Sequence, residues 1–216
     1  MPEVLEIATV HGPARAHLHL TKSARGALVL GHGAGGGVTA PDLVAATRAA
    51  ASGGFAVALV EQPYRVAGRR SPAPAAQLDA AWTTVVAELR SGPLASGTLV
   101  TGGRSSGARV ACRTADAVGA DGVLCLAFPV HPPGRPEKSR LDELDAVGVP
   151  VLVVQGERDP FGMPPDAPGR AVVRVRGDHG LKSDRAALES AVSAWLSSLG
   201  GSRRRGRAPR GDRAPE

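Results

Sequence analysis

Short, almost continuously apolar runs alternate with longer segments of helical periodicity from Ala27 onward, and this alternation limits the possible folds more than any other feature. Uninterrupted apolar runs are typical of strands buried on both faces of a parallel sheet. The expected strands are Ala27–Leu30, Phe55–Val60, Thr98–Thr101, Gly122–Ala127, Val151–Gln155 and Ala171–Val175. The expected helices are Asp42–Ala51, Ala75–Leu89, Ala108–Ala117, Arg140–Ala146 and Arg185–Leu199. We therefore predict an α/β fold whose mostly parallel sheet carries helices on both faces.

The two ends of the chain differ from this central pattern. Val4–Thr9 and Ala14–Leu20 alternate loosely between apolar and polar residues, so we expect an antiparallel pair at the sheet edge. A length of 216 residues fits one domain, which we place at residues 1–200. No insertion between the expected elements is long enough for a cap domain. Residues 201–216 are rich in Arg, Gly and Pro, and we predict that they form a disordered tail.

The net charge of +6 comes mostly from this tail, which carries six arginines and two acidic residues. The nearly neutral remainder gives no global field for phosphates, so nucleic-acid binding is expected, if at all, through the tail alone. No signal peptide and no apolar run of membrane-spanning length is present, which predicts a soluble, cytoplasmic protein. Cys112 and Cys125 lie in apolar runs and indicate no disulfide. No residue spacing indicates a metal or other cofactor, and none indicates an oligomeric state.

The segment Gly103-Arg104-Ser105-Ser106-Gly107 lies between an expected strand and an expected helix. A G-x-S-x-G sequence in this context is typical of a sharp turn that exposes a nucleophilic serine. Its glycines allow the backbone to turn without a clashing Cβ atom. The N–H group of Ser106 could then face a developing oxyanion. The alternative is a plain glycine-rich turn into a helix.

A second glycine-rich segment, Gly31–Gly37, follows the first buried strand directly. A loop at this place can donate the other N–H group of an oxyanion hole, and we assign that role to Ala34 and Gly35. A phosphate loop would need Lys-Ser or Lys-Thr after the glycines, and a dinucleotide site would need an acid near residue 50, where the chain has alanine. His32 is expected to orient the loop.

Asp159 and His179 each follow a later strand and complete the order Ser, Asp, His. His179 would take the proton of Ser105 and return it to the leaving group, while Asp159 would fix the imidazole tautomer. Glu157 and Asp178 are the rival acids. Asp178 adjoins the histidine in sequence, which makes support of its ring awkward, so Asp159 is preferred.

Two further residues follow strands on the side where such a site would open. An anionic group of a substrate could bind Tyr64, Arg65, Arg69 and Arg70, although the sequence favours solvated loop charges. His131, on a proline-rich loop, could line the substrate pocket or pin its loop by a hydrogen bond. We predict Tyr64 and His131 as substrate-binding residues.

Together these segments resemble the small α/β-hydrolases related to dienelactone hydrolase. Within them, the closest resemblance is to the subgroup of the testis-expressed hydrolase-like protein and the third subunit of the NSL acetyltransferase complex. The matching segments are residues 31–36, 62–64, 102–109, 128–137, 155–162 and 177–182. The resemblance implies an α/β-hydrolase fold without a cap domain and places Ser105, Asp159 and His179 at the triad positions.

The order of the triad predicts a serine hydrolase that acts through an acyl-enzyme intermediate, and the absence of a cap domain favours a small ester or thioester as its substrate. Two departures limit the resemblance. Ser106-Gly107-Ala108 stands where the subgroup has Met-Gly-Gly, and dienelactone hydrolase itself uses cysteine, so its substrate is not carried over. Because the subgroup includes a subunit of a complex, the alternative function is a catalytically silent interaction scaffold.

Overall fold

The computed structural model describes residues 3–202 and contains eight strands and six helices in that range. Residues 203–216, which include every arginine of the predicted tail, lie outside the described residues. The strands are β1 (Glu3–Ile7), β2 (Ala14–His19), β3 (Gly26–Gly31), β4 (Phe55–Glu61), β5 (Thr98–Arg104), β6 (Gly122–Leu126), β7 (Val151–Gly156) and β8 (Arg170–Val175). The helices are α1 (Pro41–Ser52), α2 (Pro63–Val66), α3 (Ala75–Ser91), α4 (Ser106–Thr114), α5 (Leu141–Asp145) and α6 (Arg185–Ser202).

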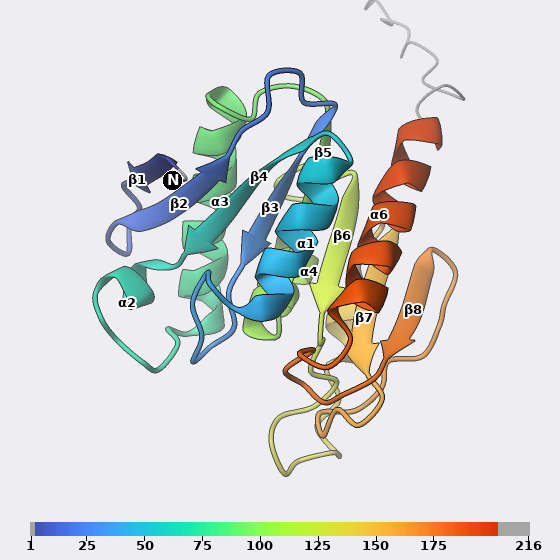
Figure 1. Ribbon diagram of the computed structural model, residues 1–216. Helices are drawn as coiled ribbons and strands as arrows, with labels where there is room; N and C mark the ends of the chain where they lie inside the picture. Colours follow the sequence, from blue (N-terminus) through green and yellow to red (C-terminus); the bar gives the residue numbers. More distant parts are fainter. Residues whose placement is uncertain (1–2, 203–216) are drawn as a thin grey trace, which may run out of the picture.

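The strands form one sheet in the order β1-β2-β4-β3-β5-β6-β7-β8. The pairs β1–β2 and β2–β4 are antiparallel and all other pairs are parallel, which confirms the predicted edge pair and the mostly parallel sheet. Helices α1 and α6 cover one face of this sheet, and α3 and α4 cover the other (Figure 1). The connections between the described elements are short, and none of them builds a cap domain.

Alternation along β3 shows how the two faces are filled. Leu28 and Leu30 pack in the core cluster that contains side chains of α1 and α6. Ala27 and Val29 pack in the cluster on the other face, where Trp82 of α3 is buried. Successive side chains of a strand point to opposite faces, so a strand covered by helices on both sides has to be apolar at every position.

The parallel strands bring their carboxyl ends together at the lower edge of the sheet in Figure 1. Segments that follow these strands therefore become neighbours, which is where open α/β sheets place their sites. They carry the glycine-rich loop after β3, Ser105 after β5, Asp159 after β7 and His179 after β8.

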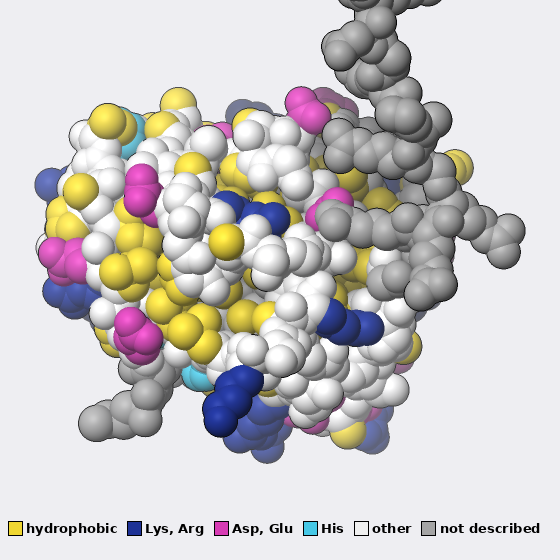
Figure 2. Space-filling model, turned by 90° about the horizontal axis from the view of Figure 1, so that it is seen from above, with side chains coloured by type: hydrophobic (Ala, Val, Ile, Leu, Met, Phe, Trp, Pro, Cys, Tyr) yellow, Lys and Arg dark blue, Asp and Glu magenta, His cyan; other side chains and the backbone are white. Residues whose placement is uncertain are grey.

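The opposite edge of the sheet is shown in Figure 2. Acidic and basic side chains of the described residues lie interspersed among hydrophobic and uncharged atoms on this face. Within residues 3–202, no helix combines the length and the apolar character needed to cross a bilayer.

Candidate active site

Three side chains at the carboxyl edge form a continuous chain of hydrogen bonds. His179 Nε2 lies 2.9 Å from Ser105 Oγ, and His179 Nδ1 lies 2.8 Å from Asp159 Oδ2. The Asp159 side chain is fully buried and that of His179 is 17% exposed. Because the Asp159 carboxylate can only accept a hydrogen bond, His179 Nδ1 must be the donor and carries the proton. His179 Nε2 is then free to accept a hydrogen bond from the serine hydroxyl. A hydroxyl, an imidazole and a carboxylate bonded in this order could act as a nucleophile, a base and an acid that orients the base.

Ser105 lies on a strained turn between β5 and α4. Its φ of 51° is unusual for a residue other than glycine, and its ψ is −107°. Both flanking glycines pack against β3: a Cβ atom at Gly103 would lie 2.5 Å from the carbonyl oxygen of Gly31, and one at Gly107 would lie 2.6 Å from the Gly31 carbonyl carbon. The glycines are therefore required by the close approach of α4 and β3, as the motif predicts.

The acid of this group is held by further donors. Gln155 Nε2 lies 2.9 Å from Asp159 Oδ2, and the backbone N–H of Phe161 donates to Oδ1 at 2.9 Å. Gln155 Nε2 is also within hydrogen-bond distance of the carbonyl oxygens of Phe128 and Gly162, which ties the acid to two loops. Gln155 was not assigned a role from the sequence. The only signal was a buried amide at the end of an otherwise apolar strand.

Neither of the rival acids, Glu157 and Asp178, bonds the His179 ring. Glu157 is exposed on the same loop as Asp159. Asp178 is exposed too, and its Oδ1 accepts from the backbone N–H of Gly180 at 2.9 Å. Of the acids weighed from the sequence, Asp159 is thus the one that bonds the His179 ring.

The expected oxyanion donors lie on two segments, the beginning of α4 and the glycine-rich loop after β3. Ser106 is the first residue of α4, so its N–H group has no acceptor within the helix and lies at the positive end of the helix dipole. Ala34 and Gly35 form the centre of a turn that is closed by the hydrogen bond from Gly36 N to Gly33 O, 3.1 Å long. A Cβ atom at Gly107 would also lie 2.9 Å from His32 O, so α4 and this loop adjoin.

The glycine-rich loop is anchored by two buried rings. His32 Nε2 accepts from Gln62 N at 3.2 Å, and its Nδ1 then donates to Gly33 O at 2.8 Å. Burial lowers the pKa of His32, which keeps the ring neutral and able to act as both acceptor and donor. Tyr64 donates its hydroxyl proton to Ala34 O at 2.9 Å, and burial raises the pKa of this phenol to about 12.

The two residues predicted to bind substrate have different surroundings. Tyr64 is only 6% exposed, and its hydroxyl donates to Ala34 O in the glycine-rich loop. His131 bonds through Nδ1 to Pro132 O at 2.9 Å, within its own loop, and its ring lies next to Gly162. Phe161 is the ring that contacts the base: its centroid lies 4.4 Å from that of His179. Phe161 was not singled out from the sequence.

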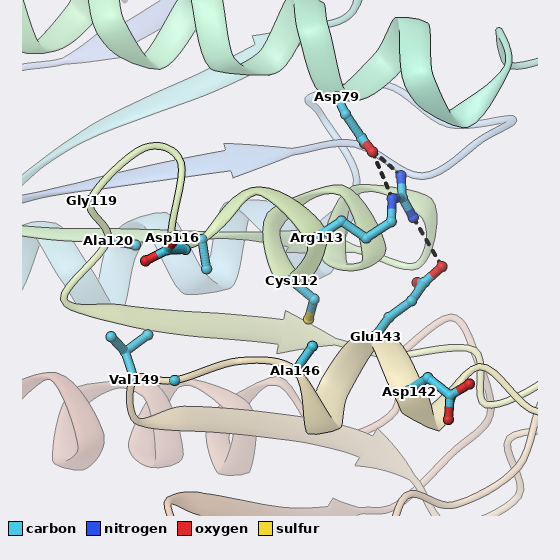
Figure 3. Close-up of a pocket in the computed structure, with 12 residues that line it drawn as sticks. Asp79, Cys112, Arg113, Asp116, Gly119, Ala120, Asp142, Glu143, Ala146 and Val149 are labelled. Carbon is cyan, nitrogen blue, oxygen red and sulfur yellow. Dashed lines mark hydrogen bonds and ion pairs between the residues drawn. The ribbon is translucent and has the colours of Figure 1, made fainter.

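A cavity of about 630 Å³ lies away from the three residues of this chain of hydrogen bonds. It lies between α3, α4 and α5, and Figure 3 shows Arg113 reaching across it to Asp79 and Glu143. The buried thiol of Cys112 lines it, 3.5 Å from the thiol of Cys125, and both cysteines are free. Among residues 3–202, no group of three or more His, Cys, Asp or Glu side chains could hold a metal ion.

The family model described as alpha/beta hydrolase domain matches residues 24–193, and the chain belongs to this family. None of the curated proteins matches the chain.

Several solved structures share the fold. An α/β serine hydrolase without lid from Xanthomonas campestris is 21% identical, with a TM-score of 0.70, and the alignment covers 90% of this chain and 94% of that one. An esterase from Pyrococcus furiosus is 14% identical, with a TM-score of 0.73 and coverage of 93% and 94%. A dienelactone hydrolase from Anabaena variabilis is 15% identical, with a TM-score of 0.67 and coverage of 92% and 96%. These similarities confirm the predicted fold class.

Proposed function

We propose that the protein is a serine hydrolase that cleaves a small ester or thioester through an acyl-enzyme intermediate. The observation that carries this proposal is the chain of hydrogen bonds from Ser105 Oγ through the His179 ring to Asp159. A catalytically silent scaffold would not need a strained serine, a correctly protonated imidazole and a buried carboxylate in series. The proposed substrate is a small acyl compound, and no cofactor takes part.

The steps follow from the positions of the side chains. His179 Nε2 accepts the proton of Ser105 while Oγ attacks the substrate carbonyl. The N–H groups of Ser106 and of the Ala34-Gly35 turn stabilise the resulting oxyanion. The imidazolium then gives its proton to the leaving alkoxide or thiolate, which departs and leaves the acyl group on Ser105. A water molecule then loses a proton to His179 and attacks the acyl carbon. The imidazolium returns this proton to Ser105 Oγ as the bond between the acyl group and Oγ breaks, and the carboxylic acid leaves.

Two further points support a small substrate and an open site. The described residues build no cap domain over the carboxyl edge. Structural neighbours include proteins described as esterases and as a serine hydrolase without lid. We also propose, on the sequence resemblance, that the chain belongs to the subgroup of the testis-expressed hydrolase-like protein, and that it works in the cytoplasm.

A fluorophosphonate probe tests the proposed nucleophile. Intact-mass analysis should show one adduct on the wild-type protein and none on Ser105→Ala, because the probe reacts only with an activated serine. Ser91→Ala, which removes an exposed hydroxyl at the end of α3, should retain the adduct. An unlabelled wild-type protein with the circular dichroism of a folded α/β domain would favour the scaffold.

Tyr64→Phe separates a loop anchor from a substrate-binding residue. The change deletes the donor to Ala34 O, and a hydrogen bond of about 1 kcal/mol corresponds to a fall in kcat of about 5-fold if it acts on the oxyanion loop. We expect this fall with KM almost unchanged, measured with p-nitrophenyl acetate. A raised KM at constant kcat would instead mean that the hydroxyl binds substrate.

A further inference from the structure

Arg104, the residue before the proposed nucleophile, connects parts of the site that are distant in sequence. Its Nη2 donates to the backbone carbonyl of His179 at 3.1 Å, and its Nε lies 3.1 Å from Asp42 Oδ2. The Arg104 side chain is 21% exposed, whereas the Asp42 side chain is fully buried. The guanidinium thus lies between solvent at the site and a carboxylate beneath it.

Arg104 also contacts the glycine-rich loop. A Cβ atom at Gly33 would lie 2.8 Å from Arg104 Nη1, so the guanidinium packs where a side chain at Gly33 would otherwise lie. One side chain therefore contacts the loop of the expected oxyanion donors and the backbone of the base, and it is attached to the residue next to the nucleophile.

Burial of the Asp42 carboxylate costs folding free energy. Asp42 is the second residue of α1, and one oxygen, Oδ1, accepts from Leu43 N at 3.0 Å. Its Oδ2 has no hydrogen-bond partner among the described residues. The positive charge of the Arg104 guanidinium is therefore the main interaction that offsets the cost of burying this oxygen. Burial raises the pKa of Asp42, and the cation of Arg104 opposes that rise. A carboxylate kept here at such a cost indicates that holding Arg104 in place has a function.

We propose that Arg104, held by Asp42, is a positioning residue that fixes His179 and the glycine-rich loop relative to Ser105. This inference rests on the proposed hydrolase function. Displacement of a catalytic group by about 1 Å can cost about 100-fold in rate, so losing this bridge should lower kcat without changing substrate affinity. A purely structural Arg104 would do no more than neutralise Asp42.

Two variants distinguish these roles. Arg104→Met leaves the buried carboxylate unpaired, so it should lose stability and lower kcat by about 10- to 100-fold, with KM within about 2-fold. The double variant Arg104→Met/Asp42→Asn removes the unpaired charge. We expect its urea midpoint to return toward the wild-type value while kcat remains low. Recovery of kcat together with stability, or no loss of kcat in the single variant, would overturn the proposal.

A matched control and a second readout complete the test. Arg170, which is buried and pairs with Asp145 at 2.8 Å at the beginning of β8, provides the control Arg170→Met/Asp145→Asn, which should keep wild-type kcat. The low-field proton NMR resonance of His179 Nδ1–H should shift or broaden in both Arg104 variants and remain in the control. Because this resonance can be recorded without turnover, it tests the positioning role even if the wild type does not react with fluorophosphonate. A wild type that does not react would overturn the proposed function. An unchanged resonance in the double variant would overturn the positioning role.

Discussion

Asp159→Asn should lower kcat for ester hydrolysis by about 10⁴-fold while the protein remains folded. Three donors surround this carboxylate: His179 Nδ1 and Gln155 Nε2 at Oδ2, and Phe161 N at Oδ1. An amide in its place has one oxygen and one NH₂ group, so in either orientation a donor faces another donor. Both orientations also remove the charge that stabilises the imidazolium. Steady-state kinetics with a p-nitrophenyl ester would measure the loss.

Asp178→Asn is the matched control for this prediction. Asp178 precedes His179 in sequence but is exposed and bonds only locally, to Gly180 N. Its change to asparagine should leave kcat within about 2-fold, as for a surface substitution away from the reacting atoms. If Asp178→Asn lost activity and Asp159→Asn retained it, the acid would be wrongly assigned and the bond to Nδ1 would not be the functional one.

Sequence patterns predicted the mostly parallel sheet, and parallel strands by themselves bring the segments that follow them to one edge. Once β5, β7 and β8 are parallel, the residues after them meet at one edge, and Ser105, Asp159 and His179 can be proposed without knowing any side-chain conformation. The glycine-rich loop lies at the same edge for the same reason, since it follows the central strand β3.

The predicted ends of strands and helices differ from the observed ones where glycine residues interrupt the apolar pattern, and one helix is too short to show a pattern. The strand predicted to end at Thr101 continues to Arg104, because residues 102–104 pair with β6 although Gly102 and Gly103 have no β-propensity. Helix α4 begins at Ser106 instead of Ala108, since Gly107 is a poor helix former that nevertheless lies in the first turn. The four residues of α2 are too few to show a helical period.

Contacts between side chains that are distant in the sequence could not be predicted from sequence patterns. Tyr64 lies on the predicted side of the molecule, and the sequence did not indicate that its hydroxyl donates to Ala34 O. The bridge from Asp42 through Arg104 to His179 O joins α1, the nucleophile turn and the loop after β8. No local period reports such a bridge, because it depends on rotamers and on how closely the layers pack.

Gly107→Ala should destabilise the protein by about 1–3 kcal/mol, even though alanine is the better helix former by about 1 kcal/mol. The new Cβ atom would lie 2.6 Å from the Gly31 carbonyl carbon and 2.9 Å from His32 O. These are backbone atoms of a central strand and its loop, so they cannot rotate away as a side-chain end could. The clash therefore outweighs the propensity gain, and the difference should be visible in urea unfolding.

Gly37→Ala provides the comparison, because no atom lies within 4 Å of a Cβ atom built there and its φ is not positive. It should leave the free energy of unfolding within about 0.5 kcal/mol of the wild type. Gly107→Ala should also lower kcat, since relief of the clash moves α4, and with it the Ser106 N–H, away from the glycine-rich loop. Equal stability of the two variants would mean that α4 and β3 can separate at little cost, and the second glycine of G-x-S-x-G would then not be required by their packing.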